Sequence, residues 1–119
     1  MTLEKAKERR RKIQKNMLKT AKAYATYIKK KLGKATIVLY GSVVRGDFGK
    51  LSDIDVLVIS DKLKRNFLDR FDVLLSQKYA SVEPKGYTRK EFLSLRKTKS
   101  FEYMLAKKNI LKDDLLLFP

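Results

Sequence analysis

The stretch ATIVLYGSVVRGDFGKLSDIDVLVIS, residues 35–60, decides the fold. Its first six residues are mostly β-branched or large and apolar on both faces, which predicts a central strand covered on both sides. Residues 54–60 have the same character and predict a second strand, beginning at Asp53 or Ile54. The glycine-rich connection between them is too short for the crossover that a parallel pair needs, so we expect antiparallel neighbours.

A motif occupies the connection and its borders. It has the pattern G-S-x-x-R-G-x-x-x-x-x-S-D-x-D and consists of Gly41-Ser42, Arg45-Gly46 and Ser52-Asp53-Ile54-Asp55. Gly41 lets a phosphate approach the backbone, because it has no Cβ. Ser42 supplies a hydroxyl and can cap a short helix over residues 43–45, whose free N–H groups favour an anion. Arg45 can reach that phosphate or neutralise Asp47, and the pattern does not separate these two roles.

The two aspartates of the motif form a candidate metal site. Side chains two residues apart on a strand share a face at about 6.5–7 Å, so Asp53 and Asp55 project together. Carboxylates this close repel each other unless a cation bridges them. Leu57 and Ile59 continue the same face as core, which places the acids at the rim of the sheet. The alternative is a solvated strand edge with two unrelated acids.

The composition narrows the chemistry. The chain has 119 residues and no cysteine, histidine or tryptophan, which excludes disulfides, Ser-His-Asp and Cys-His catalysis and the usual zinc sites. A metal held by oxygen alone is typically magnesium or manganese. The length predicts one domain, residues 1–119, without a second substrate-binding domain. We expect a cytoplasmic protein, because neither a membrane span nor a signal peptide is evident.

The net charge of +16 is unevenly distributed. Residues 1–34 hold 13 Lys or Arg and 2 acids, whereas residues 35–86 are almost neutral. A strongly basic segment attracts polyanions such as RNA or other nucleic acid, nucleotides or an acidic protein. A lysine-rich solvated surface, as in heat-adapted proteins, is the alternative.

The remaining elements follow from periodicity. Residues 3–32 predict one long basic helix with an apolar stripe at spacings of three and four, ended by Gly33. Residues 63–77 predict a second helix, whose apolar face is Phe67, Leu68, Phe71, Leu74 and Leu75. A strand over 79–83 should end at Pro84, and a capping box, Thr88 to Glu91, should start another helix. A helix over 101–108 precedes apolar fragments that form an edge strand or a contact patch.

The motif resembles the active site of the DNA polymerase β-like nucleotidyltransferase superfamily. It is most similar to the minimal nucleotidyltransferase (MNT) family, closely over residues 36–60 and loosely to about residue 111. The resemblance implies an α+β, two-layer fold with a small mixed, largely antiparallel sheet and helices packed on one face. In that family a later strand supplies a third carboxylate, for which Glu83 is the candidate. The family more often has aspartate there, and the longer glutamate shifts the reach of the charge.

The resemblance also implies an activity. Asp53, Asp55 and Glu83 would hold two Mg²⁺ or Mn²⁺ ions about 3.5–4 Å apart, while Gly41, Ser42 and Arg45 would bind the nucleotide. The reaction would transfer a nucleoside monophosphate, AMP from ATP, to an acceptor hydroxyl, with a carboxylate taking the hydroxyl proton.

Partners remain open from the sequence. Family members of this size resemble antitoxins paired with a helical HEPN-type protein, so an adenylylating antitoxin is one expectation. A non-catalytic partner-binding antitoxin and a nucleic-acid-binding module that uses the basic helix are the alternatives. A homodimer is also open, because the long helix has only one apolar stripe.

Overall fold

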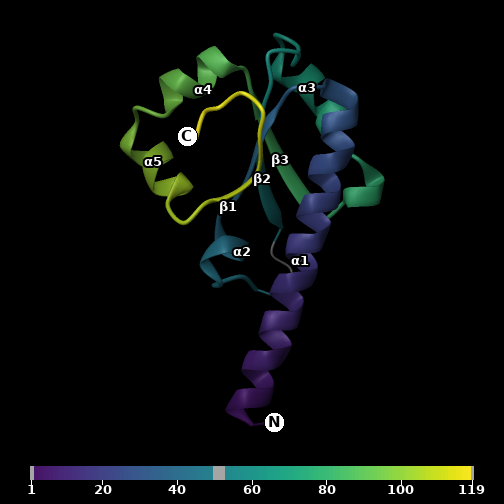
Figure 1. Ribbon diagram of the computed structural model, residues 1–119, viewed down its shortest axis with the longest axis vertical. Helices are drawn as coiled ribbons and strands as arrows, with labels where there is room; N and C mark the ends of the chain where they lie inside the picture. The colour runs from purple at the N-terminus through teal and green to yellow at the C-terminus, as the bar shows by residue number, and fades with distance from the viewer. Residues whose placement is uncertain (1, 50–52, 119) are drawn as a thin grey trace.

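The computed structural model describes residues 2–49 and 53–118 (Figure 1). Along the chain, the described helices and strands are α1 (Leu3–Leu32), β1 (Thr36–Tyr40), α2 (Ser42–Arg45), β2 (Ile54–Ile59), α3 (Phe67–Leu74), β3 (Val82–Tyr87), α4 (Arg89–Leu95), α5 (Lys99–Leu105) and β4 (Asn109–Asp113). A short 3₁₀ turn, Gln77–Tyr79, precedes β3.

The four strands form one mixed sheet in the order β3-β2-β1-β4. β1 is antiparallel to β2 and to β4, while β2 and β3 run parallel. All five residues of β1 are buried, as expected for a central strand covered on both sides. The antiparallel pairing of the two motif strands and the mixed, largely antiparallel sheet are therefore confirmed.

Helices cover both faces of the sheet, so the expectation that they pack on one face was wrong. On one face, α1 and α3 pack over Ile37 and Leu39 of β1. On the other, α4, α5 and the C-terminal segment pack over Val38 and Tyr40, as the arrangement in Figure 1 shows. The physical reason lies in β1 itself, because both of its alternating sets of side chains are apolar and each set needs a cover.

β3 differs from its expected position. It runs from Val82 to Tyr87 and passes through Pro84, whereas the sequence predicted a strand over 79–83 that stopped there. Proline has no N–H to donate, but β3 is an edge strand and pairs only with β2, so no ladder bond is lost on its open side.

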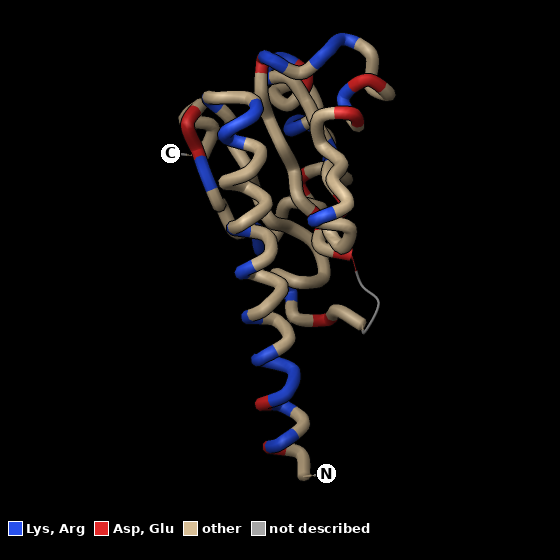
Figure 2. Tube along the Cα trace, turned by 90° about the vertical axis from the view of Figure 1, so that its right-hand side faces the viewer, with Lys and Arg blue, Asp and Glu red and all other residues tan. Residues whose placement is uncertain are grey.

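The long first helix is confirmed at the expected bounds. Thr2 caps it through a hydrogen bond from the Lys5 amide, and the Gly33 N–H donates to the Lys29 carbonyl at its end. Its buried residues begin only at Ala21, so the N-terminal half extends beyond the sheet and accounts for the longest dimension of 50 Å (Figure 2). Across residues 2–49 and 53–118, no helix is long and apolar enough to cross a membrane.

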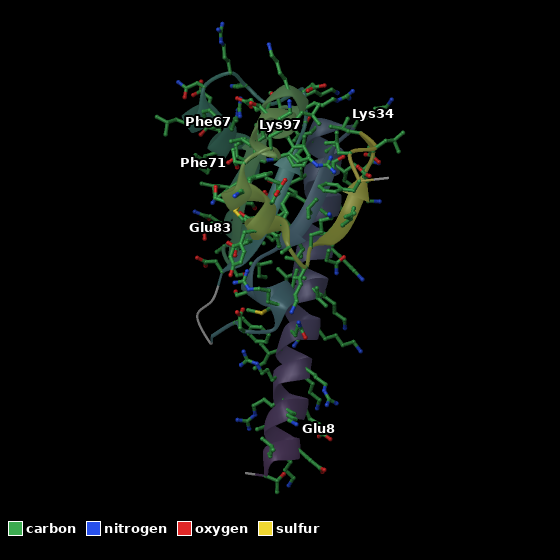
Figure 3. All side chains as sticks on the ribbon, turned by 90° about the vertical axis from the view of Figure 1, so that its left-hand side faces the viewer. Glu8, Lys34, Phe67, Phe71, Glu83 and Lys97 are labelled. Atoms are coloured by element: carbon green, nitrogen blue, oxygen red, sulfur yellow. The ribbon has the colours of Figure 1, made fainter. Side chains whose placement is uncertain are left out.

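α3 is shorter and less buried than the sequence predicted. Leu74 is the buried residue of its expected apolar face, whereas Phe67, Leu68, Phe71 and Leu75 are exposed. Figure 3 shows Phe67 and Phe71 on the outer side of the molecule. Of the three charged residues of α3, Arg70 is buried together with Leu74, whereas Asp69 and Asp72 are exposed.

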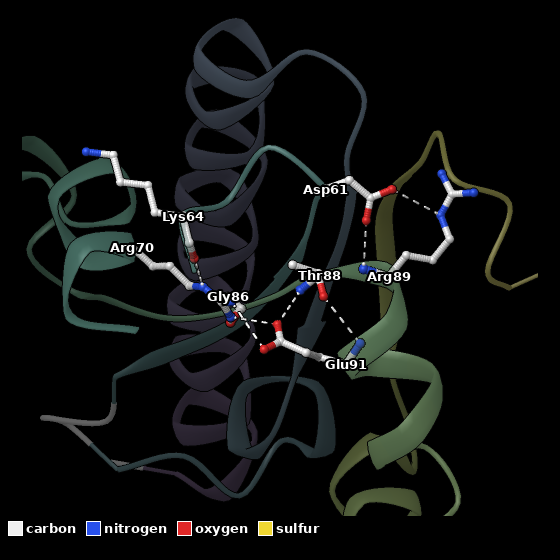
Figure 4. Close-up of polar contacts among 7 residues, drawn as sticks. All are labelled: Asp61, Lys64, Arg70, Gly86, Thr88, Arg89 and Glu91. Carbon is white, nitrogen blue, oxygen red and sulfur yellow. Dashed lines mark hydrogen bonds and ion pairs between the residues drawn. The ribbon is translucent and has the colours of Figure 1, made fainter. Parts of the chain in front are cut away.

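Arg70 ties α3 to β3 and α4 (Figure 4). Its guanidinium is 3 % exposed and donates to the Lys64 carbonyl at 2.6 Å, the Gly86 carbonyl at 3.0 Å and both oxygens of Glu91. Glu91 also accepts from the Thr88 amide, which confirms the predicted capping box at the start of α4.

The apolar fragments near the C-terminus take up two different structures. Residues 109–113 form β4 at the sheet edge, which confirms the edge-strand interpretation. Leu117 is buried, and Phe118 packs against Phe92 with ring centroids 5.6 Å apart. This segment therefore covers the second face of the chain's own sheet. Leu116 stays exposed. The helix expected over residues 101–108, α5, spans Lys99–Leu105, and β4 begins at Asn109.

Candidate functional site

The turn that follows β1, at Gly41, lies directly against Asp55 of β2. Gly41 has φ +81° and ψ −152°, a conformation that is essentially restricted to glycine. A Cβ placed on Gly41 would also overlap the Asp55 carboxylate. The contact arises because Tyr40, at the end of β1, pairs with Asp55 in the antiparallel ladder. The two halves of the sequence motif therefore converge.

Ser42 does not cap α2 as expected. It is the first residue of the helix, and Gly41 occupies the capping position without a side-chain hydrogen bond. Ser42 is half-buried, one residue from the turn that contacts Asp55. Gly46 ends α2, and its N–H donates to the Ser42 carbonyl at 2.8 Å.

Arg45 forms one of its two predicted contacts. Its Nε lies 3.2 Å from Oδ2 of Asp47, and both side chains are more than a third exposed. An exposed ion pair of this kind contributes little stability, about 0–1 kcal/mol. Its positive charge also lowers the pKa of Asp55 slightly, against larger opposing effects, so Arg45 lies within electrostatic reach of the carboxylates. The guanidinium is therefore available to a more highly charged anion such as a triphosphate.

Asp55 and Glu83 are neighbours on adjacent strands. They pair directly in the parallel register of β2 and β3, where strands lie about 4.8 Å apart and paired side chains share a face. Figure 3 labels Glu83 on β3, at the edge of the sheet. Asp53 lies one residue before β2 and is exposed.

The pKa of Asp55 is raised above its ordinary value. Burial is the main cause, and the negative charges of Glu83 and, more weakly, Asp53 add to it, while Lys85 opposes it. The three predicted carboxylates thus share one electrostatic field. Groups that repel in this way are stabilised when a cation enters between them.

The donor set suits magnesium held partly by substrate. Within residues 2–49 and 53–118, no three acidic side chains gather closely enough to enclose an ion by themselves. Magnesium, however, is usually bound by one or two carboxylates and completed by water and substrate phosphates. Asp55 and Glu83 supply such a pair, with Asp53 beside them. Ser52, predicted as part of the motif, lies outside the described residues.

Tyr40 is a site residue that the sequence analysis missed. Its side chain is 3 % exposed, and its hydroxyl has no hydrogen-bond partner in the part of the chain that the structure describes. Burial raises the pKa of this hydroxyl well above its ordinary value, and the charges of Asp55, Tyr87 and Glu83 raise it further. Tyr40 therefore keeps its proton and offers an unused donor beside the carboxylates. Tyr40 shares a face with Asp55 through the antiparallel register of β1 and β2, which no single stretch of the sequence reveals.

Lys85 is the second residue that was missed. It follows Glu83 by two positions on β3 and shares its face, and its positive charge partly offsets the repulsion that raises the pKa of Asp55. The predicted strand ended at Pro84, so nothing in that interpretation placed Lys85 beside the acids. The cation is suited to contact the phosphates of a nucleotide held there.

The long helix α1 holds α2 and the loop that follows it. Arg10 donates to the Gly46 carbonyl at 2.9 Å and the Phe48 carbonyl at 2.6 Å, and its guanidinium stacks 4.3 Å from the Phe48 ring centroid. Gln14 donates from Nε2 to the Val43 carbonyl at 2.7 Å. These contacts join segments about 30 to 40 residues apart, so no local pattern in the sequence predicted them.

Comparisons with known proteins agree with this geometry. A family model described as a nucleotidyltransferase domain matches residues 21–118. The crystal structure of "a putative nucleotidyltransferase from Sulfolobus solfataricus" superimposes with a TM-score of 0.62 at 21 % identity, covering 85 % of this chain and 84 % of that one. At this identity the likeness concerns the fold. A search of curated proteins found no match.

Proposed function

The chain belongs to the nucleotidyltransferase domain family, and we propose that it transfers AMP from ATP to an acceptor hydroxyl in a metal-dependent reaction. Membership of the family makes it an enzyme of the nucleotidyl-transfer class. The metal requirement, the nucleotide and the acceptor are the parts that we propose. The choice of ATP and AMP rests on the resemblance to minimal nucleotidyltransferases.

One observation supports the proposal most directly, namely the contact between the Gly41 turn and the Asp55 carboxylate. The missing Cβ of Gly41 makes room for the Asp55 carboxylate, so the turn that leads into Ser42 and Arg45 lies directly against an acid that repels its neighbours. A nucleotide with bound magnesium suits this arrangement, because Ser42 and Arg45 can contact its phosphates while the cation relieves the carboxylate repulsion.

The residues divide the work as follows. Asp55 and Glu83, with Asp53 beside them, would hold magnesium, which when bound neutralises the charge of the triphosphate and of the leaving pyrophosphate. Arg45 and Lys85 add positive charge for the phosphates, and Tyr40 offers a protonated donor at the base of the site. Positioning and charge neutralisation of this kind are the main contributions of proteins to phosphoryl chemistry. A site carboxylate takes the proton of the acceptor hydroxyl.

The test measures how magnesium changes ATP affinity. Isothermal titration with ATP, with and without magnesium, should show tighter binding when the ion is present. Asp55→Asn should abolish this gain, and Glu83→Gln should reduce it, because each removes one carboxylate ligand. Asp61→Asn is the control, since Asp61 is an exposed acid that pairs with Arg89. Wild-type protein that binds no magnesium nucleotide, or an Asp55→Asn variant with an undiminished gain, would contradict the proposal.

A second candidate function is binding to a helical, HEPN-type protein partner. It is supported by the apolar side chains that α3 leaves in solvent, which are 41–74 % exposed at Phe67, Leu68, Phe71 and Leu75. Co-purification with a helical protein encoded beside this gene tests it. The double variant Leu68→Asp/Phe71→Asp should abolish the complex, whereas Leu93→Asp on α4 should leave it intact. A complex that survives the double variant would exclude α3 as the contact.

A further inference from the structure

The projecting half of α1 carries positive charge that the rest of the described chain does not neutralise. Eight Lys or Arg residues lie on it between residues 5 and 19, with Glu8 as the one acid in that range (Figure 2). Across residues 2–49 and 53–118, none of these eight cations takes part in a salt bridge. Like charges one turn apart on a helix destabilise it slightly, so this arrangement costs folding energy unless an anion compensates it.

A groove separates this half of α1 from the loop of the candidate active site. It has a volume of about 200 Å³ and is lined by Lys7, Arg10, Arg11, Gln14, Gly46 and Phe48. Arg10 is already bonded to the loop and Gln14 to α2, whereas the side chains of Lys7 and Arg11 line the groove without such a bond in the described part of the chain. The groove is thus lined by cations of α1 on one side and by Gly46 and Phe48 of the loop on the other.

The same side of α1 continues as a line of cations. Lys7, Arg11, Lys15 and Lys22 fall at spacings of four, four and seven residues, which places them within one sector of the helix. Lys22 lines a second hollow of about 420 Å³, shared with residues 109–112 of β4. At 1.5 Å per residue the line is about 22 Å long. We name these four residues the inner cations.

Four other cations of the helix lie in a different sector. Lys5, Arg9, Lys12 and Lys19 occupy the sector that faces away from the body, as the 100° step per residue requires. These four outer cations have the same composition, three lysines and one arginine. Replacing the outer cations changes the net charge as much as replacing the inner cations does. A difference between the two variants therefore reports the position of the charges.

We propose that single-stranded RNA binds along the inner cations and presents its 3′ end to the candidate active site, so that RNA is the acceptor. The inference rests on the proposed nucleotidyl transfer for the role of the 3′ end, though not for the binding. Single-stranded RNA suits this arrangement, because a flexible backbone can follow a line of cations past the hollow beside the loop. A lipid surface fits poorly, because the projecting half exposes few large apolar side chains, Leu3 and Ile13.

The reaction of an RNA 3′-hydroxyl with ATP needs no further reactant. The 3′-hydroxyl oxygen forms a bond to the α-phosphorus of ATP, and the bond from that phosphorus to the bridging oxygen breaks. Pyrophosphate leaves with the electron pair, and a site carboxylate takes the hydroxyl proton. The RNA would end one AMP longer.

Binding is tested without ATP or magnesium, so its outcome is independent of catalysis. The probe is a fluorescein-labelled 20-nucleotide single-stranded RNA, followed by anisotropy between 50 and 200 mM salt. The inner variant is Lys7→Gln/Arg11→Gln/Lys15→Gln/Lys22→Gln, and the outer variant is Lys5→Gln/Arg9→Gln/Lys12→Gln/Lys19→Gln. Circular dichroism checks that both keep the helix.

We expect the inner variant to bind RNA at least 10-fold more weakly than wild type at 50 mM salt, and the outer variant less than 3-fold. Each lost contact should also reduce the slope of log K against log salt by about 0.7. Equal weakening in both variants would overturn the proposal, because it would reveal an effect of net charge alone. So would undetectable binding by wild type at 50 mM salt, or tighter binding to polyglutamate than to RNA.

The experiments distinguish a failure of the RNA-acceptor proposal from a failure of the proposed nucleotidyl transfer. The inner variant should keep the magnesium-dependent gain in ATP affinity, because its four residues do not contact Asp55 or Glu83. With labelled ATP, wild type should extend the RNA, and the inner variant should extend it more slowly at subsaturating RNA. Wild-type protein that binds RNA and Mg-ATP but never labels the RNA would overturn the acceptor assignment while leaving nucleotide binding untouched.

Discussion

At the scale of single residues, the strongest constraint is at Gly41. Gly41→Ala should destabilise the protein by about 3 kcal/mol, because alanine meets both a conformation restricted to glycine and the Asp55 carboxylate. The displaced carboxylate should also lose its effect on Mg-ATP binding. Urea unfolding and titration calorimetry measure the two effects.

Gly46→Ala is the matched control for Gly41. Gly46 has φ +86° and ψ 6°, in the left-handed helical region, and the nearest atom to an added Cβ is Nε2 of Gln14 at 4.0 Å. It should cost about 1 kcal/mol, from backbone strain alone, and should keep the magnesium-dependent gain in ATP affinity. Equal losses at the two glycines in both measurements would show that contact with Asp55 is unimportant.

Tyr40 permits a prediction in which stability and binding change in opposite directions. Tyr40→Phe removes a buried hydroxyl that lacks a partner in the described structure, so the free energy of unfolding should rise by about 1 kcal/mol. Mg-ATP affinity should fall, because the donor beside the carboxylates is lost.

The control for Tyr40 is another buried tyrosine. The Tyr24 hydroxyl donates to the Leu74 carbonyl at 2.5 Å, so Tyr24→Phe should lower stability by about 1 kcal/mol and leave Mg-ATP affinity unchanged. A Tyr40→Phe variant that unfolds as easily as Tyr24→Phe would indicate that the hydroxyl already has a partner in the free protein.

Some residues of the candidate site could be predicted from the sequence, and others could not. Asp53 and Asp55 were found because both belong to one local motif, and Glu83 was placed through a family resemblance. Tyr40 and Lys85 join the acids only through the registers of β1, β2 and β3. Register depends on which strands pair, which is a property of the folded sheet rather than of any one segment.

At the scale of elements, Arg70 holds α3, β3 and α4 together. Arg70→Leu would leave Glu91 and the Gly86 and Lys64 carbonyls without this donor, so we expect a loss of about 3 kcal/mol. Glu91→Gln keeps an acceptor for both Arg70 and the Thr88 amide and should cost about 1 kcal/mol. Urea unfolding at pH 7 checks both values. A loss below 1 kcal/mol for Arg70→Leu would mean that packing alone joins the three elements.

The same elements separate what periodicity can predict from what it cannot. The apolar spacing in α3 correctly indicated a helix, and its face was expected to be buried. Arg70 is buried instead, because the strand end and the start of α4 offer it carbonyl and carboxylate partners. β3 similarly crosses Pro84 because it has a free edge. The burial of Arg70 depends on partners distant in the sequence, and the passage of β3 through Pro84 depends on its place at the edge of the sheet.

At the scale of the whole molecule, most of the net positive charge lies apart from the acids of the candidate site. The acids of the candidate site lie at one end of the sheet, and the basic half of α1 extends past that end. The uneven charge was visible in the sequence. The position of the basic half of α1 beside the site was not, since it depends on the bonds of Gln14 to α2 and of Arg10 to the loop that follows.

Acid should destabilise the whole molecule, because several carboxylates have lowered pKa values in the folded state. Hydrogen bonding to Arg70 lowers the pKa of Glu91, and the Lys29 ammonium, 2.7 Å away, lowers that of Asp114. For Asp113, burial raises the pKa, but hydrogen bonds from the Leu117 and Phe118 amides and the Thr36 hydroxyl outweigh it and lower it.

A lowered folded-state pKa contributes stability above the unfolded-state value of about 4, and that contribution is lost as pH falls through the folded value. Urea unfolding should therefore give equal stability at pH 7 and 6 and a steep decline below about pH 4. Asp114→Asn should lower stability at pH 7 and flatten the decline, because it removes one titrating partner. The protein's positive charge also grows in acid, so added salt should restore part of the loss by screening repulsion. A decline that is unchanged in Asp114→Asn and insensitive to salt would assign acid unfolding to other groups.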